Sequence, residues 1–250
     1  ISALVSEDCW QATPGKVVDL VRNLGIAAGG TVMEDCRVLE ACREGKYTSV
    51  LVQTHDKKYV EYRTEHFVNA LGSGAGKLCD SMGIDAGLYP VRHQAFITRR
   101  LPMLGKHGTN MDMLIDRQDY KGFSAVYGQQ IAYTGQIIGC ASPKLDAMRI
   151  DKNLKVNTKA FLEIVSEMFS EWIPDLAGVG IQAVWAGYYT EPRYIVDPEL
   201  GLFVGMRGHG FMLSQYIARM YVDKLLGRPV PEYFEKLKLN GPGLSEKAFK

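Results

Sequence analysis

The chain has 250 residues, of which 46% are hydrophobic and 23% are charged, and its formal net charge is +1. This length allows one large or two small domains with a buried core, and the proportions of hydrophobic and charged residues are ordinary for a globular protein. A near-neutral charge without a polybasic run argues against a nucleic-acid or membrane-surface partner, and no run of ~18 apolar residues offers a membrane span.

Cysteine and histidine are scattered along the chain. The spacing contains no C-x-x-C, H-x-x-x-H or H-E-x-x-H pattern, so we expect no metal site and no disulfide framework, and we expect a reducing, cytoplasmic location. The chain opens with Ile1 and shows no secretory leader. It therefore reads as a processed chain, a fragment, or one subunit of something larger.

The first third of the sequence predicts a helix followed by a meander of strands. The helix covers residues 14–29, with Thr13 as a candidate N-cap, Pro14 in the first turn and Gly29–Gly30 at its end. Four runs rich in β-branched residues follow, separated by polar turns: 31–39, 47–54, 59–62 and 66–70.

The glycine-rich stretch "LGSGAGKL" at residues 71–78 is similar to a phosphate-binding loop. Such a loop needs Ser or Thr after its lysine to bind magnesium, and Leu78 stands there after Lys77. We interpret the stretch as a turn between the strand ending at Ala70 and a helix over residues 75–82.

The middle of the chain predicts a second sheet and an amphipathic helix. Strand-like segments rich in tyrosine run from residue 86 to residue 140. The helix covers residues 157–172 and ends before Pro174. Its apolar face consists of Phe161, Leu162, Val165, Met168, Phe169 and Trp172.

The last part predicts a strand with a turn over 179–197, a short strand at 200–205 and a helix over 211–226. Three glycines, Gly205, Gly208 and Gly210, lie between the short strand and that helix. A strand, a glycine-rich turn and a helix start can present backbone N–H groups to a ligand without side chains in the way.

Several separated motifs, taken in order, resemble those of the FAD-dependent D-amino-acid oxidase, sarcosine oxidase and glycine oxidase family. They are "AAGGTVMEDCRVLEA", "VNALGSGAGKL", "YPVRHQAFI", "IPDLAGVGIQAVWAGYYTEPRYIVD" and "GMRGHGF". The resemblance covers nearly the whole chain but only the C-terminal part of such an enzyme. The N-terminal G-x-G-x-x-G segment, which holds the FAD pyrophosphate in that family, is not in this sequence.

The resemblance implies a mixed α+β and α/β fold, the C-terminal part of a two-domain flavoprotein. A Rossmann-like FAD-binding portion would be combined with an antiparallel-sheet substrate domain. Residues 1–85 would belong to the FAD-binding domain, 86–175 to the substrate domain, and 176–250 would return to the FAD-binding domain.

The resemblance also implies which residues meet noncovalent FAD. The turn at 206–213 would lie beside the flavin, where the start of the last helix stabilises negative charge on the ring. The implied cofactor contacts are Val38, Ala70, Leu71, Gly72, Met206, Arg207, Gly208, His209, Gly210, Phe211, Met212 and Leu213.

On the substrate side the sequence departs from its relatives. Glycine-oxidase-like members carry Arg where Tyr189 and Gly208 stand, and sarcosine-oxidase-like members carry Lys where Met212 stands. Members with covalent flavin use a Cys near Ala186, so the flavin here is expected to be noncovalent. The remaining candidates for substrate contacts are Arg92, Tyr188, Tyr189 and Arg207; no catalytic acid or base is assigned.

The function implied by the resemblance is oxidation of the C–N bond of an amino acid or secondary amine by hydride transfer to FAD. Two alternatives stay open: a related flavoprotein that oxidises a 2-hydroxy acid, and a non-catalytic subunit completed by a partner chain. The expected partners are a small amine or amino acid and a second polypeptide or N-terminal segment that carries the dinucleotide motif.

Overall fold

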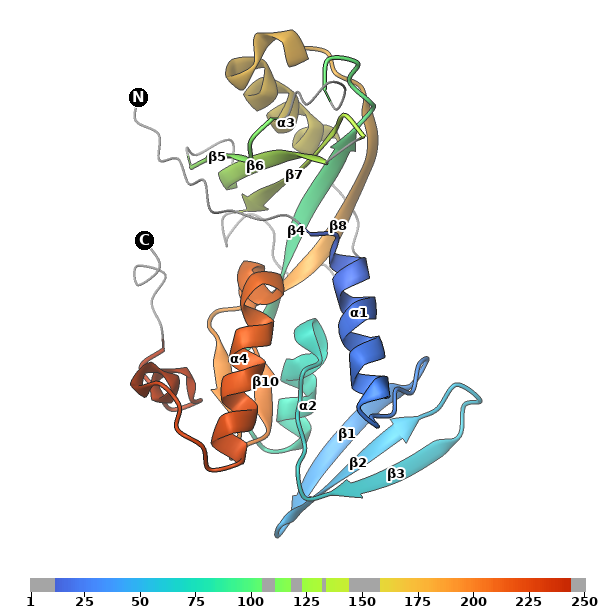
Figure 1. Ribbon diagram of the computed structural model, residues 1–250, viewed down its shortest axis with the longest axis vertical. Coiled ribbons are helices and arrows are strands. Elements are labelled where there is room, and N and C mark those ends of the chain that lie inside the picture. Colours follow the sequence, from blue (N-terminus) through green and yellow to red (C-terminus); the bar gives the residue numbers. More distant parts are fainter. Residues whose placement is uncertain (1–11, 105–110, 118–122, 132–133, 144–157, 244–250) are drawn as a thin grey trace.

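The computed structural model is elongated, with a five-stranded sheet at one end and a three-stranded sheet at the other (Figure 1). The structure describes residues 12–104, 111–117, 123–131, 134–143 and 158–243. Asn157, the expected first residue of the amphipathic helix, lies outside these ranges.

The N-terminal part contains helix α1 and an antiparallel meander, as predicted. Its elements are α1 (Pro14–Ala27), β1 (Arg37–Glu44), β2 (Tyr47–Gln53) and β3 (Tyr59–Thr64). Although α1 has an apolar side, none of its residues is buried.

Two of the predicted strands are wrong. The strand expected over 31–39 begins only at Arg37, because Asp35 adopts a φ of 54°, a left-handed conformation that interrupts an extended chain. The strand expected over 66–70 is absent, and only Asn69 pairs there, in a single parallel bridge with Leu202. The Asn69 side chain instead accepts a hydrogen bond from the Leu71 N–H and donates one to the Ala75 carbonyl, which turns the chain into the next helix.

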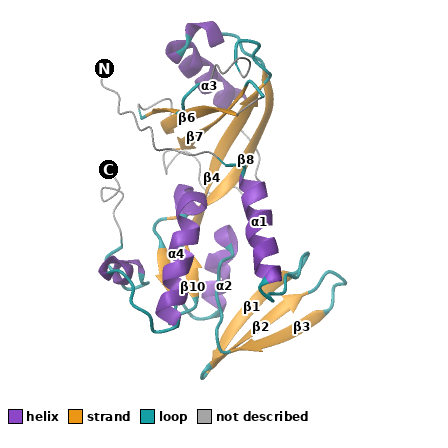
Figure 2. Cartoon of the chain, viewed as in Figure 1, coloured by secondary structure: helices purple, strands orange, loops and turns teal. Residues whose placement is uncertain are grey.

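Three further elements form the centre of the molecule. Helix α2 (Ala75–Ser81) packs beside the two-stranded sheet of β9 (Ile195–Asp197) and β10 (Leu202–Val204). Helix α4 (Gly210–Leu225) packs over the same region through Ile217, Met220 and Tyr221. Figure 2 shows α1, α2 and α4 together in the lower half.

The five-stranded sheet confirms the second predicted sheet. Its order is β5-β6-β7-β4-β8, and every neighbouring pair is antiparallel. The strands are β4 (Tyr89–Thr98), β5 (Leu114–Asp116), β6 (Phe123–Ile131), β7 (Gln136–Pro143) and β8 (Ile181–Glu191).

Helix α3 (Thr158–Trp172) covers one face of this sheet, as the apolar pattern predicted. Side chains alternate between the faces of a strand, so Phe96, Val126 and Ile137 point to α3 and form a core with Phe161 and Met168. Their strand neighbours point to the opposite face, and the cavity described next lies there.

Candidate active site

The sheet face opposite α3 carries a cavity of about 300 Å³. Such a volume lies at the lower end of the range for small-molecule sites. The lining residues are His93, Ala95, Met113, Tyr127, Gln129, Ile138, Gly139, Cys140, Trp185, Gly187 and Tyr189.

The register of the sheet explains why this face is hollow. Tyr127 pairs with Cys140, Cys140 with Ala95, and Ala95 with Trp185, so one row across four strands has small residues between two large aromatic ones. In the next row Gly187 lies opposite His93. A Cβ on Gly187 would meet no atom within 4 Å, so the missing side chain leaves open space.

Aromatic rings form one wall of the cavity. The rings of His93 and Tyr189 stack with centroids 3.7 Å apart, which is the diagonal contact expected between neighbouring strands. The Tyr189 hydroxyl lies 3.4 Å from the Tyr127 hydroxyl. These contacts hold three side chains from β4, β6 and β8 in one cluster.

The cluster is electrically neutral near pH 7. Burial, assisted by the charge of Arg207, lowers the pKa of His93 to about 4, so its imidazole is uncharged. Burial also raises the pKa values of Tyr127 and Tyr189, and raises the pKa of Cys140 to about 11. Both phenols therefore stay protonated. One O–H donates to the other phenol, and the remaining O–H can donate to a ligand.

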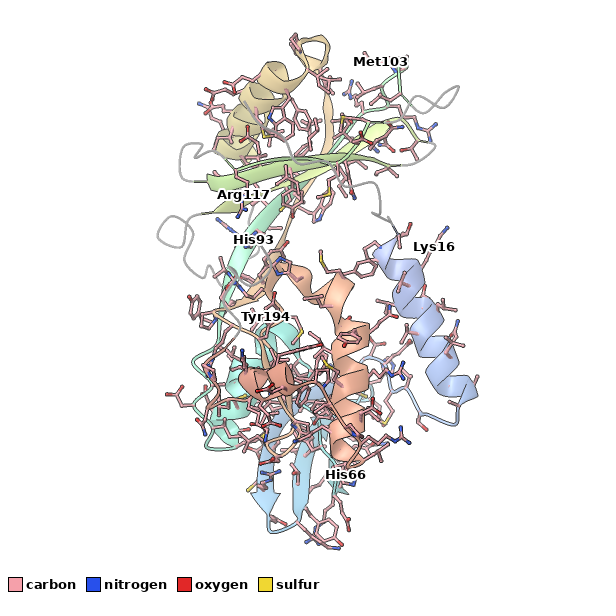
Figure 3. All side chains as sticks on the ribbon, turned by 60° about the vertical axis from the view of Figure 1, so that its left-hand side comes forward. Lys16, His66, His93, Met103, Arg117 and Tyr194 are labelled. Carbon is pink, nitrogen blue, oxygen red and sulfur yellow. The ribbon has the colours of Figure 1, made fainter. Side chains whose placement is uncertain are left out.

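The glycine-rich turn before α4 contacts one residue of the cavity wall, Tyr189. A Cβ on Gly208 would lie 2.7 Å from Cε2 of Tyr189, so the turn backbone rests directly on the ring that lines the cavity. Gly205 has a φ of +71°, which only glycine adopts without strain, and it starts the turn. Figure 3 shows His93 on β4 of the five-stranded sheet, near the middle of the molecule, and Tyr194 below it.

The start of α4 has no side-chain cap. The first N–H groups of a helix lack partners within the helix, so an uncapped start can donate to a ligand. His209 precedes the helix, and its Nδ1 lies 2.5 Å from the Tyr194 hydroxyl. Of the predicted contacts that follow, Phe211 and Met212 are exposed, whereas Leu213 packs on the core under α4 with Met206.

Arg207 is held by an ion pair. Its Nε lies 2.5 Å from Oε2 of Glu191 at the end of β8, and both side chains are largely buried. Arg207 also adopts a φ of 49°. The guanidinium charge is therefore compensated within the protein, although the sequence offered it as a contact for substrate or flavin.

The other predicted cofactor contacts come from β1 and from the turn before α2. Val38 is a half-buried residue of β1 that pairs with Val52. Ala70, Leu71 and Gly72 are exposed in the turn before α2, and Gly72 has a φ of 54°. Their role at a cofactor stays a prediction.

Among the predicted substrate contacts, Tyr189 lines the cavity. Arg92 and Tyr188 pair with each other across β4 and β8, one residue out of phase with the cavity-lining positions, so their side chains belong to the other face. The sequence reasoning missed His93, Tyr127 and Trp185. The signal for Trp185 was present in "WAGYY", where positions 185, 187 and 189 share one face.

The chain belongs to the DAO family, described as FAD dependent oxidoreductase, whose model matches residues 1–224. The resemblance inferred from the motifs and the mixed fold are thereby confirmed.

Solved structures of this fold include three amino-acid-oxidising enzymes. L-proline dehydrogenase from P. horikoshii matches with a TM-score of 0.69 and 24% identity, over 90% of this chain and 59% of its own. Glycine oxidase from Geobacillus kaustophilus matches with a TM-score of 0.64 and 17% identity, over 86% of this chain and 54% of its own. Iminodiacetate oxidase from Chelativorans sp. BNC1 matches with a TM-score of 0.65 and 14% identity, over 91% of this chain and 58% of its own. The chain thus spans less than two thirds of the length of each, and no curated protein sequence matches it.

The described residues provide neither a membrane-spanning helix nor a metal-binding cluster. No helix in the described ranges is both long and apolar enough to cross a bilayer. The same residues contain no group of three or more His, Cys, Asp or Glu side chains placed to hold a metal ion.

Proposed function

We propose that the chain is part of an FAD-dependent enzyme that oxidises the C–N bond of an amino acid or secondary amine. The observation that carries this proposal is the contact between Gly208 and Tyr189. Through it, the uncapped start of α4 and the aromatic cavity form one continuous site. A cofactor at the helix start and a substrate in the cavity would be neighbours.

The residues of the turn fit FAD. Gly208 is exposed at this turn, and the exposed Phe211 and Met212 add apolar surface beside it. Helix starts favour anionic groups, and a flavin gains negative charge when it accepts electrons. We propose that residues 206–213 hold the flavin, and that Val38 and residues 70–72 contact the rest of the cofactor.

FAD, when bound, supplies the acceptor for a hydride from the carbon next to the amine nitrogen. The protein residues bind and orient the substrate. One of the two hydrogen-bonded phenols, Tyr127 or Tyr189, can donate a hydrogen bond to it, and the stack of His93 on Tyr189 keeps that phenol ring in place. The neutral walls favour an unprotonated amine, because a charged group loses hydration on entering such a cavity.

An apolar surface supports the need for further polypeptide. Exposed large apolar side chains extend over α1, β3 and α4: Val18, Leu20, Val21, Leu24, Ile26, Tyr59, Tyr62, Tyr216 and Val222. A surface with so many exposed apolar side chains usually marks an interface. We propose that the dinucleotide-binding segment, whether in the same chain or in a partner, covers it. The division at 1–85, 86–175 and 176–250 stays part of this proposal.

We also propose a cytoplasmic location. The support is that all four cysteines in the described part of the chain, Cys36, Cys42, Cys79 and Cys140, are free thiols.

The absorption spectrum of the complete protein tests the function. We expect a yellow protein with flavin absorption that bleaches when an amino acid or secondary amine is added without oxygen. Bleaching by 2-hydroxy acids alone would favour the related C–O oxidation. A protein that never acquires flavin, even with the segment that carries the dinucleotide motif, would contradict the proposal.

A further inference from the structure

We infer that the cavity on the five-stranded sheet selects a substrate with a bulky, uncharged, preferably aromatic substituent. It would discriminate against glycine-sized amines and against substrates with a second carboxylate. This inference rests on the proposed function and concerns the substituent that the cavity receives.

Size is the first argument. A cavity of about 300 Å³ has room for on the order of ten water molecules, since each water takes about 30 Å³ in the liquid. A ligand as small as glycine, with five heavy atoms, leaves much of that space filled with water. A substituent that displaces this water from apolar walls gains binding free energy that a small ligand cannot gain.

The chemistry of the walls is the second argument. Trp185, which is 41% exposed, and the rings of Tyr127 and Tyr189 face the space together with Met113 and Ile138. Aromatic walls bind flat apolar groups through burial and ring contacts.

Charge is the third argument. Among the described residues that line the cavity, none is Lys, Arg, Asp or Glu, and His93 is neutral because its pKa is about 4. The guanidinium whose charge helps to lower the pKa of His93 is that of Arg207, and it is already paired with Glu191. A second carboxylate in the cavity would therefore lose hydration without gaining a cationic partner.

The sheet offers a specific way to fill the space. The backbone of Gly187 lies on the cavity floor, and an added Cβ meets no atom within 4 Å. Gly187→Val would introduce a strand-compatible side chain into the cavity at a position where its Cβ has open space. Ala183→Val is the matched control, because Ala183 is exposed on the same strand and in the same phase, outside the lining.

The test uses three ligands that share an N–CH2–COOH group and differ in one substituent on nitrogen: glycine, N-benzylglycine and iminodiacetate. Binding to the complete protein is measured by calorimetry with any bound flavin held reduced, so that no ligand is turned over. We expect N-benzylglycine to bind about tenfold or more tightly than the other two. Gly187→Val should remove most of this preference, because it lowers the affinity for N-benzylglycine far more than the affinity for glycine, whereas Ala183→Val should keep the preference.

Tighter binding of iminodiacetate than of N-benzylglycine would overturn the inference, as would an undiminished preference in Gly187→Val. The proposed function fails by a different result. A protein with the expected binding preference that never holds or reduces FAD would contradict the oxidoreductase proposal and leave the selectivity of the cavity intact. A protein whose flavin is reduced by amines, but without the preference, would contradict only the inference.

Discussion

At the scale of single residues, the site depends on how closely Gly208 approaches Tyr189. The Tyr189 ring stacks on His93, at 3.7 Å between centroids, and a Cβ on Gly208 would lie 2.7 Å from its Cε2. A side chain at position 208 must therefore displace either the stacked pair or the turn itself.

We expect Gly208→Ala to lower the free energy of unfolding by about 1–3 kcal/mol and to weaken FAD binding. Chemical denaturation and flavin titration measure the two effects. Gly187→Ala is the control, because the same added methyl group meets open space there. Equal unfolding free energies and equal FAD affinities in the two variants would show that the turn does not rest on the Tyr189 ring.

His93 makes stability depend on pH. Its pKa is about 4 in the folded protein and 6.5 in the unfolded chain, so the unfolded state takes up a proton first as the pH falls. The contribution of the neutral, buried imidazole is complete above about pH 6.5 and is lost as the pH falls toward 4. Its size is about 3 kcal/mol.

We expect His93→Phe, which keeps a flat ring against Tyr189, to flatten this part of the profile. Unfolding free energies at pH 7 and pH 4.5 give the measurement, and the comparison uses the slope, because the substitution also changes packing. Identical slopes in both proteins would mean that His93 is not neutral and buried as described.

At the scale of elements, the Arg207–Glu191 ion pair ties the end of β8 to the turn before α4. Removing one partner from a largely buried pair leaves a charge with little solvent, so Arg207→Ala should cost about 3 kcal/mol. Alanine retains the left-handed backbone cost of position 207, so the loss reports mainly on the pair.

The double variant Arg207→Ala, Glu191→Gln should recover part of this loss, because the remaining carboxylate is neutralised. Arg219→Ala is the control on α4. Its side chain is 82% exposed and 3.8 Å from Asp223, so we expect a change below about 0.5 kcal/mol. Chemical denaturation gives the unfolding free energy of each of the three variants. A loss of unfolding free energy in Arg207→Ala no larger than that in Arg219→Ala would contradict a stabilising Arg207–Glu191 pair.

At the scale of the whole molecule, α1 is the clearest sign of an uncovered surface. It forms a regular helix of 14 residues, yet none of its residues is buried. A helix of this length is marginal by itself in water, since most helix stability in proteins comes from packing of its apolar side.

We expect Leu20→Gln with Leu24→Gln to lower the unfolding free energy of the complete protein by roughly 3–6 kcal/mol, if both side chains become buried. The same pair of changes should have little effect on the 250-residue portion measured without the dinucleotide-binding segment, where both side chains are exposed. Asp19→Asn with Arg22→Gln, which helical spacing places on the other side of α1, is the matched control. Equal stability of the complete protein with either pair would exclude this side of α1 as the interface.

The sequence by itself determined the kinds of elements and the family. Periodicity predicted α1, α3 and α4 and most strands to within a few residues, because local propensity and apolar spacing act over short distances. It failed at Asp35 and at Asn69, where a left-handed residue and a side-chain hydrogen bond to the backbone override strand propensity.

Only the tertiary structure decided which residues share the site. Tyr127, His93 and Tyr189 are far apart in sequence and meet because the register places β6, β7, β4 and β8 side by side. The same register assigns Tyr189 to the cavity and Tyr188 to the other face, and a shift of one residue would exchange them. Pairing partners and burial depend on distant parts of the chain, so no local pattern could specify the cavity or the neutral charge of His93.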